Sequence, residues 1–278
     1  MATATDYTVD DLICACISRQ VEDGEALAQG IATPLVAAGY LLAQLTHAPR
    51  VSFSSAVGMA LCLEGAPLGL TTTEELWLGR SLAIFDFCVA ACEVLPCLHP
   101  KEFFRPAQVD PYGQFNNIVI GEYERPRLRL PGCGGIADVS VSHPRLYLYV
   151  PRHSRAVFVE QLDFVSGLGL PTPERTGERD GVRLLISDLG TFDYEAGRMR
   201  LRSFHPGVSI DRIRKKTGFH IEVAADVDET QPPTVEEIEL LRDRVDPLGI
   251  RELERMSGGQ RRRRMREIIE IERSHPSG

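Results

Sequence analysis

Hydrophobic positions recur at helical spacing in two stretches near the start of the chain. Residues 8–21 carry apolar side chains three and four positions apart, which predicts a short helix. The segment P-L-V-A-A-G-Y-L-L-A-Q-L-T is apolar on most sides, so it predicts a buried helix. Thr33 would cap that helix and Pro34 would occupy its first position.

Apolar runs of strand length alternate with these helices. Residues 26–32 and 50–53 predict two short strands, and further strands are expected at 117–121, 146–150, 182–188 and 198–204. Residues 82–89 fit either a helix or a strand. Strands that alternate with helices predict an α/β fold with an open, mainly parallel sheet flanked by helices. Ligands of such folds bind beyond the carboxyl ends of the strands.

The pattern changes near the C-terminus. Thr234 and the glutamate three residues later form a capping-box pattern, and an Asp-Pro pair at 246–247 ends that helix. Residues 251–278 are charged and arginine-rich, so we divide the chain into an α/β domain, 1–250, and a C-terminal tail, 251–278. The run Arg261–Arg264 fits a nucleic-acid patch, but the acidic residues around it favour a solvated helix or a partner contact.

Composition limits the possible functions. The chain has 278 residues and a formal net charge of -8, which argues against nucleic-acid binding by the whole protein. Neither a membrane span nor a secretory signal is expected, so we predict a cytoplasmic protein. The seven cysteines form no C-x-x-C pair, and we expect them to be reduced, buried and apolar. The histidines are scattered without metal-binding spacing, so no metal is expected.

The most unusual local feature is a glycine-rich turn. Within L-P-G-C-G-G-I-A-D, three glycines fall in four residues at Gly132, Cys133, Gly134 and Gly135. Such a turn before a helix can offer backbone N–H groups to an anion or an oxyanion. A tight strand-to-helix turn without a ligand explains the pattern equally well.

Two polar clusters offer further candidate side chains. Gln114, Asn116 and Asn117 precede a predicted strand and could bind a polar ligand, although turn formation by asparagine is the simpler explanation. Ser54 and Ser55 follow an apolar strand. They do not form G-x-S-x-G. His47 is close in sequence, but its position indicates the end of the preceding helix, so a nucleophilic serine is not favoured.

Five stretches together resemble the β subunit of family I coenzyme A transferases of the glutaconate CoA-transferase type. They lie, in the family's order, at 32–49, 113–123, 129–138, 216–224 and 232–250. The resemblance implies the family I CoA-transferase fold, an α/β fold with an open, mainly parallel sheet. It also implies a separate α subunit, in a heterodimer or an α2β2 heterotetramer. Coenzyme A would enter as part of the substrate, with no other cofactor.

The resemblance also implies which residue of the family corresponds to the two serines. In the transferases a glutamate after this strand attacks the CoA thioester, and its position falls on Ser54, or on Ser55 if the register slips by one. A carboxylate is ionised at pH 7 and an unassisted hydroxyl is not, so neither serine replaces it well. Glu64, the nearest later carboxylate, lies beyond the expected strand tip. Ordinary CoA transfer is therefore not expected.

One branch of the family fits this departure. It is the two-subunit hydrolases of actinobacterial and proteobacterial steroid degradation, which open the last cyclohexenone ring of a steroid-derived CoA thioester. The resemblance implies that water attacks the ring ketone, that the bond breaks in a retro-Claisen sense, and that the general base lies on the α subunit.

In that interpretation this chain lines the site. The two serines leave room for the ring or for water, the glycine turn lies near the thioester, and the three amides form the polar lining. Two alternatives stay open: a true CoA-transferase β subunit, and a non-catalytic scaffold that stabilises the α subunit.

Overall fold

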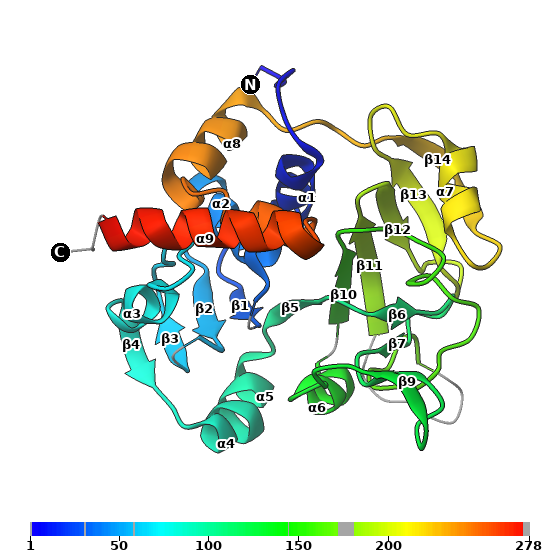
Figure 1. Ribbon diagram of the computed structural model, residues 1–278, viewed down its shortest axis with the longest axis horizontal. Helices are drawn as coiled ribbons and strands as arrows, with labels where there is room; N and C mark the ends of the chain where they lie inside the picture. Colours follow the sequence, from blue (N-terminus) through cyan, green and yellow to red (C-terminus); the bar gives the residue numbers. More distant parts are fainter. Residues whose placement is uncertain (1, 31, 58, 144, 172–180, 275–278) are drawn as a thin grey trace. The chain divides into compact units, whose positions relative to one another are not determined.

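The computed structural model describes residues 2–30, 32–57, 59–143, 145–171 and 181–274 (Figure 1). The chain divides into two compact units. The first contains Met1–Lys101 and Pro232–Gly278, and the second contains Glu102–Gln231. The two ends of the chain thus belong to one unit, and the amide of Ala4 donates to the carbonyl of Pro233 at 2.9 Å.

A small mixed sheet forms the centre of the first unit. Its strands are β1 (Ala26–Gln29), β2 (Ser52–Ser55), β3 (Ala60–Cys62) and β4 (Ser81–Ile84), in that spatial order. β1 and β2 are parallel, whereas β2–β3 and β3–β4 are antiparallel. Alternate residues of β2 are buried, so its side chains point to two different environments.

The helices predicted at the start of the chain and after Thr234 are confirmed as α1 (Val9–Ser18), α2 (Pro34–Thr46), and α8 (Val235–Glu239) with η2 (Leu240–Val245). A further short helix, α3 (Thr73–Leu78), was not predicted. Thr234 begins α8 with the expected capping box. α1 and α2 pack closely at Gly39, where an added Cβ would lie 2.6 Å from Cγ2 of Ile17. Glycine is therefore required at this crossing.

The ambiguous stretch 82–89 contains both a strand and a helix. β4 ends at Ile84, and Asp86 then caps a helical segment composed of α4 (Phe87–Val89), η1 (Ala90–Val94) and α5 (Leu95–Leu98). No side chain of these three short elements is buried.

Exposure of this segment corrects the prediction for the cysteines. Cys14, Cys16 and Cys62 are buried and free, as expected. The remaining four are not buried: Cys88, Cys92 and Cys97 are exposed, and Cys133 is partly exposed. The prediction of burial was wrong for these four. Three of them lie on the helical segment after β4, which buries no side chain against the described residues, and Cys133 lies in the open glycine-rich turn.

The segment 251–274, predicted as a tail, is part of the first unit. It forms η3 (Ile250–Glu254) and α9 (Gly258–Ser274). Arg251 is buried between the carboxylates of Asp11 and Asp246, at 2.6 and 2.8 Å. The units of the structure therefore do not divide at residue 250, and the described residues of this segment are anchored by buried ion pairs.

The second unit contains a larger mixed sheet. In spatial order its strands are β14 (Glu222–Glu229), β13 (Arg200–Phe204), β12 (Gly190–Asp193), β11 (Gly181–Ser187), β10 (Arg145–Val150) and β5 (Lys101–Phe104). β5, β10 and β11 are parallel, β12 is antiparallel to both neighbours, and β14 is parallel to β13. The predicted α/β fold is confirmed, with parallel strands extended by antiparallel ones.

Shorter elements complete the second unit. They are the hairpins β6 (Gln108–Val109) with β7 (Phe115–Asn116) and β8 (Val119–Gly121) with β9 (Pro126–Arg129), and the helices α6 (Ile136–Ser142) and α7 (Ile210–Lys216). The single strand predicted at 117–121 is thus shorter than expected. The side chain of Asn116 accepts from the amides of Ile118 and Val119, which turns the chain between β7 and β8.

Aromatic rings form much of the core of the second unit. The ring of His153 stacks on Phe158 with centroids 3.6 Å apart, and its two nitrogens lie at 3.1 and 3.0 Å from the hydroxyls of Ser187 and Thr217. Burial lowers the pKa of His153 to about 3, so this histidine is a neutral structural residue. No helix in the described ranges is long and apolar enough to cross a membrane.

Candidate functional site

The two serines lie side by side along β2 but face different environments. Ser55 is buried, with 3% of its surface exposed, and its hydroxyl accepts from the amide of Val57 at 3.1 Å. Ser54 is half-buried, and its hydroxyl makes no hydrogen bond to any described residue. Ser55 therefore stabilises the turn after the strand, whereas Ser54 presents a small, unengaged hydroxyl.

Neither candidate partner in the nearby sequence lies at the serine end of β2. His47 is the C-cap of α2, and its Nε2 lies 3.1 Å from the carbonyl of Val21. Glu64 is exposed and follows β3, which runs antiparallel to β2 and pairs its last residue, Cys62, with Phe53. Glu64 therefore lies beyond the start of β2, away from Ser54. Neither residue is placed to act as a base or nucleophile there.

The last residue of β1 contributes a polar group that no sequence pattern predicted. Gln29, the last residue of β1, pairs with Ser55 in the parallel register. Its side chain is 7% exposed, and Oε1 has no hydrogen-bond partner among the described residues. Ala32 adopts a left-handed conformation with φ of 58° just before α2. A buried, unpaired amide oxygen and a strained backbone both mark the carboxyl end of this strand.

A residue from the predicted tail reaches the same end of the sheet. The carboxylate of Glu254, in η3, accepts from the amide of Leu35 at 3.0 Å in the first turn of α2. This bond stabilises an otherwise unpaired amide and places a negative charge at the positive end of the helix. No local sequence pattern predicts this contact, because the two residues are 219 positions apart.

The three amide side chains of the second unit have different roles. Asn116 is fully buried and its amide nitrogen donates to Gln108 Oε1 at 2.7 Å and to the carbonyl of Val119. Its side chain is therefore engaged within the turn, as turn chemistry would require. Asn117 accepts from the amide of Ala107 at 2.8 Å, while its own Nδ2 and the side chain of Gln114 have no described partner. These two groups remain able to bind a ligand.

The glycine-rich turn is open to solvent. A Cβ added at Gly132, Gly134 or Gly135 would meet nothing within 4 Å, and Gly132 and Gly135 have φ of 115° and 76°. Gly132 and Gly135 are thus favoured by backbone conformation and not by crowding, whereas neither reason applies to Gly134. The turn leads directly into α6, and its own four amides donate no hydrogen bond to the described backbone, an arrangement that can stabilise negative charge on an oxygen.

Two of the predicted elements lie together in the second unit. The amide of Leu130 donates to the carbonyl of Ile118 at 2.9 Å, so the start of the glycine turn runs beside the residues that follow Asn117. Ser54 and Ser55 belong to the first unit. Among the described residues, no group of three or more His, Cys, Asp or Glu side chains could hold a metal ion.

Comparison with known proteins identifies similar chains. A family model for coenzyme A transferase matches residues 103–216. One of the subunits of 3-oxoadipate CoA-transferase from Pseudomonas knackmussii is 30% identical, over 85% of this chain and 92% of that protein. The cholesterol ring-cleaving hydrolase IpdB subunit of Rhodococcus jostii is 30% identical, over 86% of this chain and 92% of that protein.

A solved structure supports the same relationship. The decarboxylase AibA/AibB superimposes with a TM-score of 0.77 and 30% sequence identity, covering 89% of this chain and 98% of that chain. Transfer, ring cleavage and decarboxylation thus occur among proteins that are equally similar to this one. The reaction must be argued from the site, because the shared fold alone does not select among these chemistries.

Proposed function

This chain belongs to the coenzyme A transferase family, and we propose that it is the β subunit of a heteromeric hydrolase acting on a steroid-derived CoA thioester. The proposed reaction opens the last cyclohexenone ring by hydrolysis of a carbon–carbon bond. The observation that carries the proposal is Ser54, a small hydroxyl without a base, at the position where the resemblance implies a nucleophilic glutamate. Glu64, the nearest later carboxylate, lies beyond the opposite end of β2.

The mechanism requires water as the nucleophile. A base on the partner subunit removes a proton from water, and the oxygen bonds to the ring ketone. The carbon–carbon bond then breaks, which forms a carboxylate and leaves the electron pair on the carbon next to the thioester. The thioester holds that pair as an enolate until the carbon is protonated. The reaction therefore consumes one water and leaves CoA attached.

Residues of this chain would bind and orient the substrate. The side chain of Ser54 is small and its hydroxyl is unengaged, so it leaves room for the ring or for water. The accessible amides of the turn from Gly132 to Gly135 would donate to the thioester oxygen as negative charge develops there. The free groups of Gln114 and Asn117 would contact polar parts of the substrate, whereas Asn116 supports the turn.

An exposed apolar surface of the first unit supports a partner subunit. Leu82 and Ile84 on the edge strand β4 are 66% and 59% exposed, and Phe87 at the start of α4 is 57% exposed. Large apolar side chains gathered on consecutive elements mark interaction sites, and an edge strand adds unpaired backbone groups. We propose that a CoA-transferase α-like subunit covers this surface, in a heterodimer or an α2β2 assembly.

Two other functions are supported by specific observations. A true CoA-transferase subunit fits the similarity to the Pseudomonas knackmussii protein. In that case hydroxylamine or borohydride would trap a glutamyl-CoA adduct on a glutamate of the complex. A scaffold without a catalytic role fits the lack of an acid–base pair at Ser54, and it predicts that variants of this strand tip leave turnover unchanged.

A matched pair of variants tests whether this chain lines the site. Ser54→Leu fills the space beside the strand tip, and Ser52→Leu makes the same change on the same face of β2 but at its other end. We expect Ser54→Leu to lower turnover by the assembled complex at least about tenfold, or about 1.4 kcal/mol in the activation free energy. Ser52→Leu should retain it. Equal turnover by both variants, with the partner still bound, would establish the scaffold function instead.

A further inference from the structure

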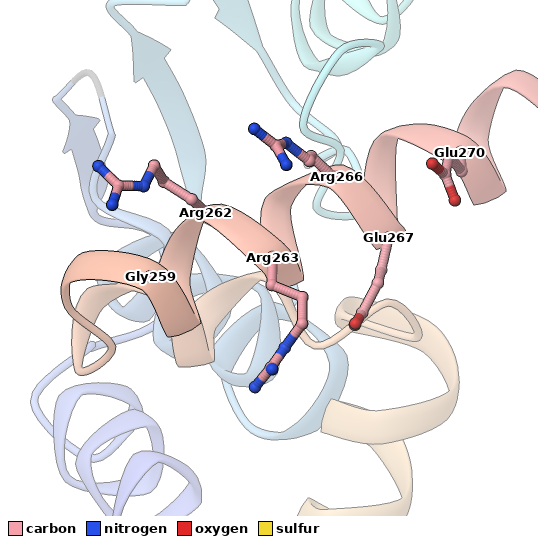
Figure 2. Close-up of a pocket in the computed structure, with 6 residues that line it drawn as sticks. All are labelled: Gly259, Arg262, Arg263, Arg266, Glu267 and Glu270. Carbon is pink, nitrogen blue, oxygen red and sulfur yellow. The ribbon is translucent and has the colours of Figure 1, made fainter.

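One face of α9 carries a surface depression of about 480 Å3 that the proposed reaction does not use. Figure 2 shows the six residues that line it along this helix. They are Gly259, Arg262, Arg263, Arg266, Glu267 and Glu270. Their spacing of three and four residues places them on one side of an α-helix.

The charged side chains of this face lack partners within the chain. Arg262, Arg263 and Arg266 are exposed and make no ion pair with the described residues, and neither does Glu270. Glu267 is shared with Arg264, whose Nη1 lies 3.3 Å from its carboxylate. Arg262 and Arg263 lie four and three residues before Arg266, so like charges repel each other along this part of the helix. The i,i+4 spacing of Arg263 to Glu267 and of Arg266 to Glu270 offsets part of that repulsion, although neither pair lies within ion-pair distance among the described residues.

Charge is divided along the face in a self-complementary way. The three arginines all precede the two glutamates along the face, so its N-terminal part is basic and its C-terminal end is acidic. If a second α9 packs antiparallel, with the two-fold axis between positions 266 and 267, Arg266 meets Glu267 of the other copy. In the same register Arg263 meets Glu270. Two-fold symmetry repeats each pair, so every contact is made twice.

We propose that this face of α9 is a docking surface for a second copy of the same chain, with the two helices antiparallel. An elongated polyanion fits less well, because the arginines and the two glutamates lie in the same depression and the acidic half would repel it. The N-terminal end of the face carries Gly259, which has no side chain. The space around it is open, because an added Cβ there would meet nothing within 4 Å. Ile271, 41% exposed, adds an apolar contact opposite Arg262.

The interface is weak and depends on salt. α9 has 17 residues and is about 26 Å long. One helix pair of this length buries less surface than the roughly 1,200–2,000 Å2 of a stable complex. Each exposed ion pair contributes little and is screened by salt. The contact would therefore join chains that are already held in larger complexes, or dimerise the isolated chain only at high concentration and low salt.

Two double variants test the proposed pairing. R263E/R266E makes the face acidic, and E267R/E270R makes it basic, so each should repel its own copy. We expect each variant to raise the dissociation constant of self-association at least about tenfold, because like charges then oppose each other. An equimolar mixture of the two should associate again, because the acidic and basic faces are complementary.

The measurement is sedimentation velocity of the full chain, with any co-purifying partner retained, in low-salt buffer and in about 1 M NaCl, where the Debye length is about 3 Å. R261E is the matched control, since Arg261 is exposed but does not line the depression. It should associate as the wild type does. The proposal is overturned if the wild type shows no association at low salt, if the mixture stays dissociated, or if R261E is as damaging as R263E/R266E.

Discussion

Replacement of Arg251 by methionine tests the strongest electrostatic feature of the first unit. Arg251 is 3% exposed, and its guanidinium lies between two carboxylates that are themselves buried. Its Nη2 lies 2.6 Å from Asp11 Oδ1, and its Nη1 lies 2.8 Å from Asp246 Oδ2. Asp11 would retain an ion pair with Arg242 at 3.0 Å. Asp246 would keep only backbone amides, so one buried carboxylate loses its counter-charge.

The expected cost follows from that uncompensated charge. Breaking a buried ion pair by removing one partner destabilises a protein by about 3–5 kcal/mol, a large share of the total of about 5–15 kcal/mol. Methionine fills much of the space of the lost side chain, so the cavity contribution is small. We therefore expect Arg251→Met to lower the free energy of unfolding by about 3 kcal/mol or more at pH 7, measured by urea denaturation.

The pH dependence separates this electrostatic cost from a packing defect. Burial raises the pKa of Asp246, and the charge of Arg251 opposes that rise. In the variant the pKa of Asp246 in the folded state rises further above its unfolded value. The folded variant then binds a proton more tightly than the unfolded chain, so its stability increases as pH falls below neutral. The deficit relative to wild type should therefore shrink on acidification.

Two further variants make the test decisive. Adding Asp246→Asn to Arg251→Met removes the unpaired charge and should recover part of the lost stability. Arg255→Met is a milder control, because Arg255 is half-buried and lies 3.5 Å from Asp10, so its loss should cost less. A cost below about 1 kcal/mol for Arg251→Met, or a cost independent of pH, would refute the reasoning.

Three other variants test the remaining features. Burial lowers the pKa of His205 to about 4, so the folded state loses stability as pH falls below 6.5, by about 1.4 kcal/mol at pH 5.5. His205→Gln should remove this loss, measured by urea titrations at about pH 6.5 and about pH 5.5. Glu254→Ala should lower the free energy of unfolding by about 1–2 kcal/mol through the uncapped amide of Leu35, and Glu254→Gln by less. Leu82→Glu should reduce co-purification with a co-expressed α-like subunit at least about tenfold, while Leu45→Glu, a control on α2, should retain it.

Local patterns predicted most of the elements, because the signals were themselves local. Pro34 at the start of α2 and the capping box at Thr234 act through neighbours only three or four residues away. Gly132 and Gly135, in the turn before α6, have positive φ, which the glycine-rich composition suggests directly. Such features are determined by the backbone before any tertiary contact forms.

The features that were missed depend on tertiary contacts. Arg251 and Glu254 fall in the segment predicted as a charged tail, yet one balances two distant carboxylates and the other caps α2. Cys88 is exposed because its helical segment buries no side chain against the described residues, and the apolar character of the segment does not show this in advance. Gln29 was overlooked because only the β1–β2 register places it beside Ser55.

The most direct test of the proposed function is the fate of the water oxygen. The chain should be co-expressed with a CoA-transferase α-like subunit and incubated with a CoA thioester that carries a cyclohexenone ring, in heavy-oxygen water. Mass spectrometry should find one heavy oxygen in a new carboxylate, with the ring opened and CoA still attached. Transfer of CoA to an added carboxylic acid, with the ring intact and no heavy oxygen in a ring-opened product, would contradict the proposal.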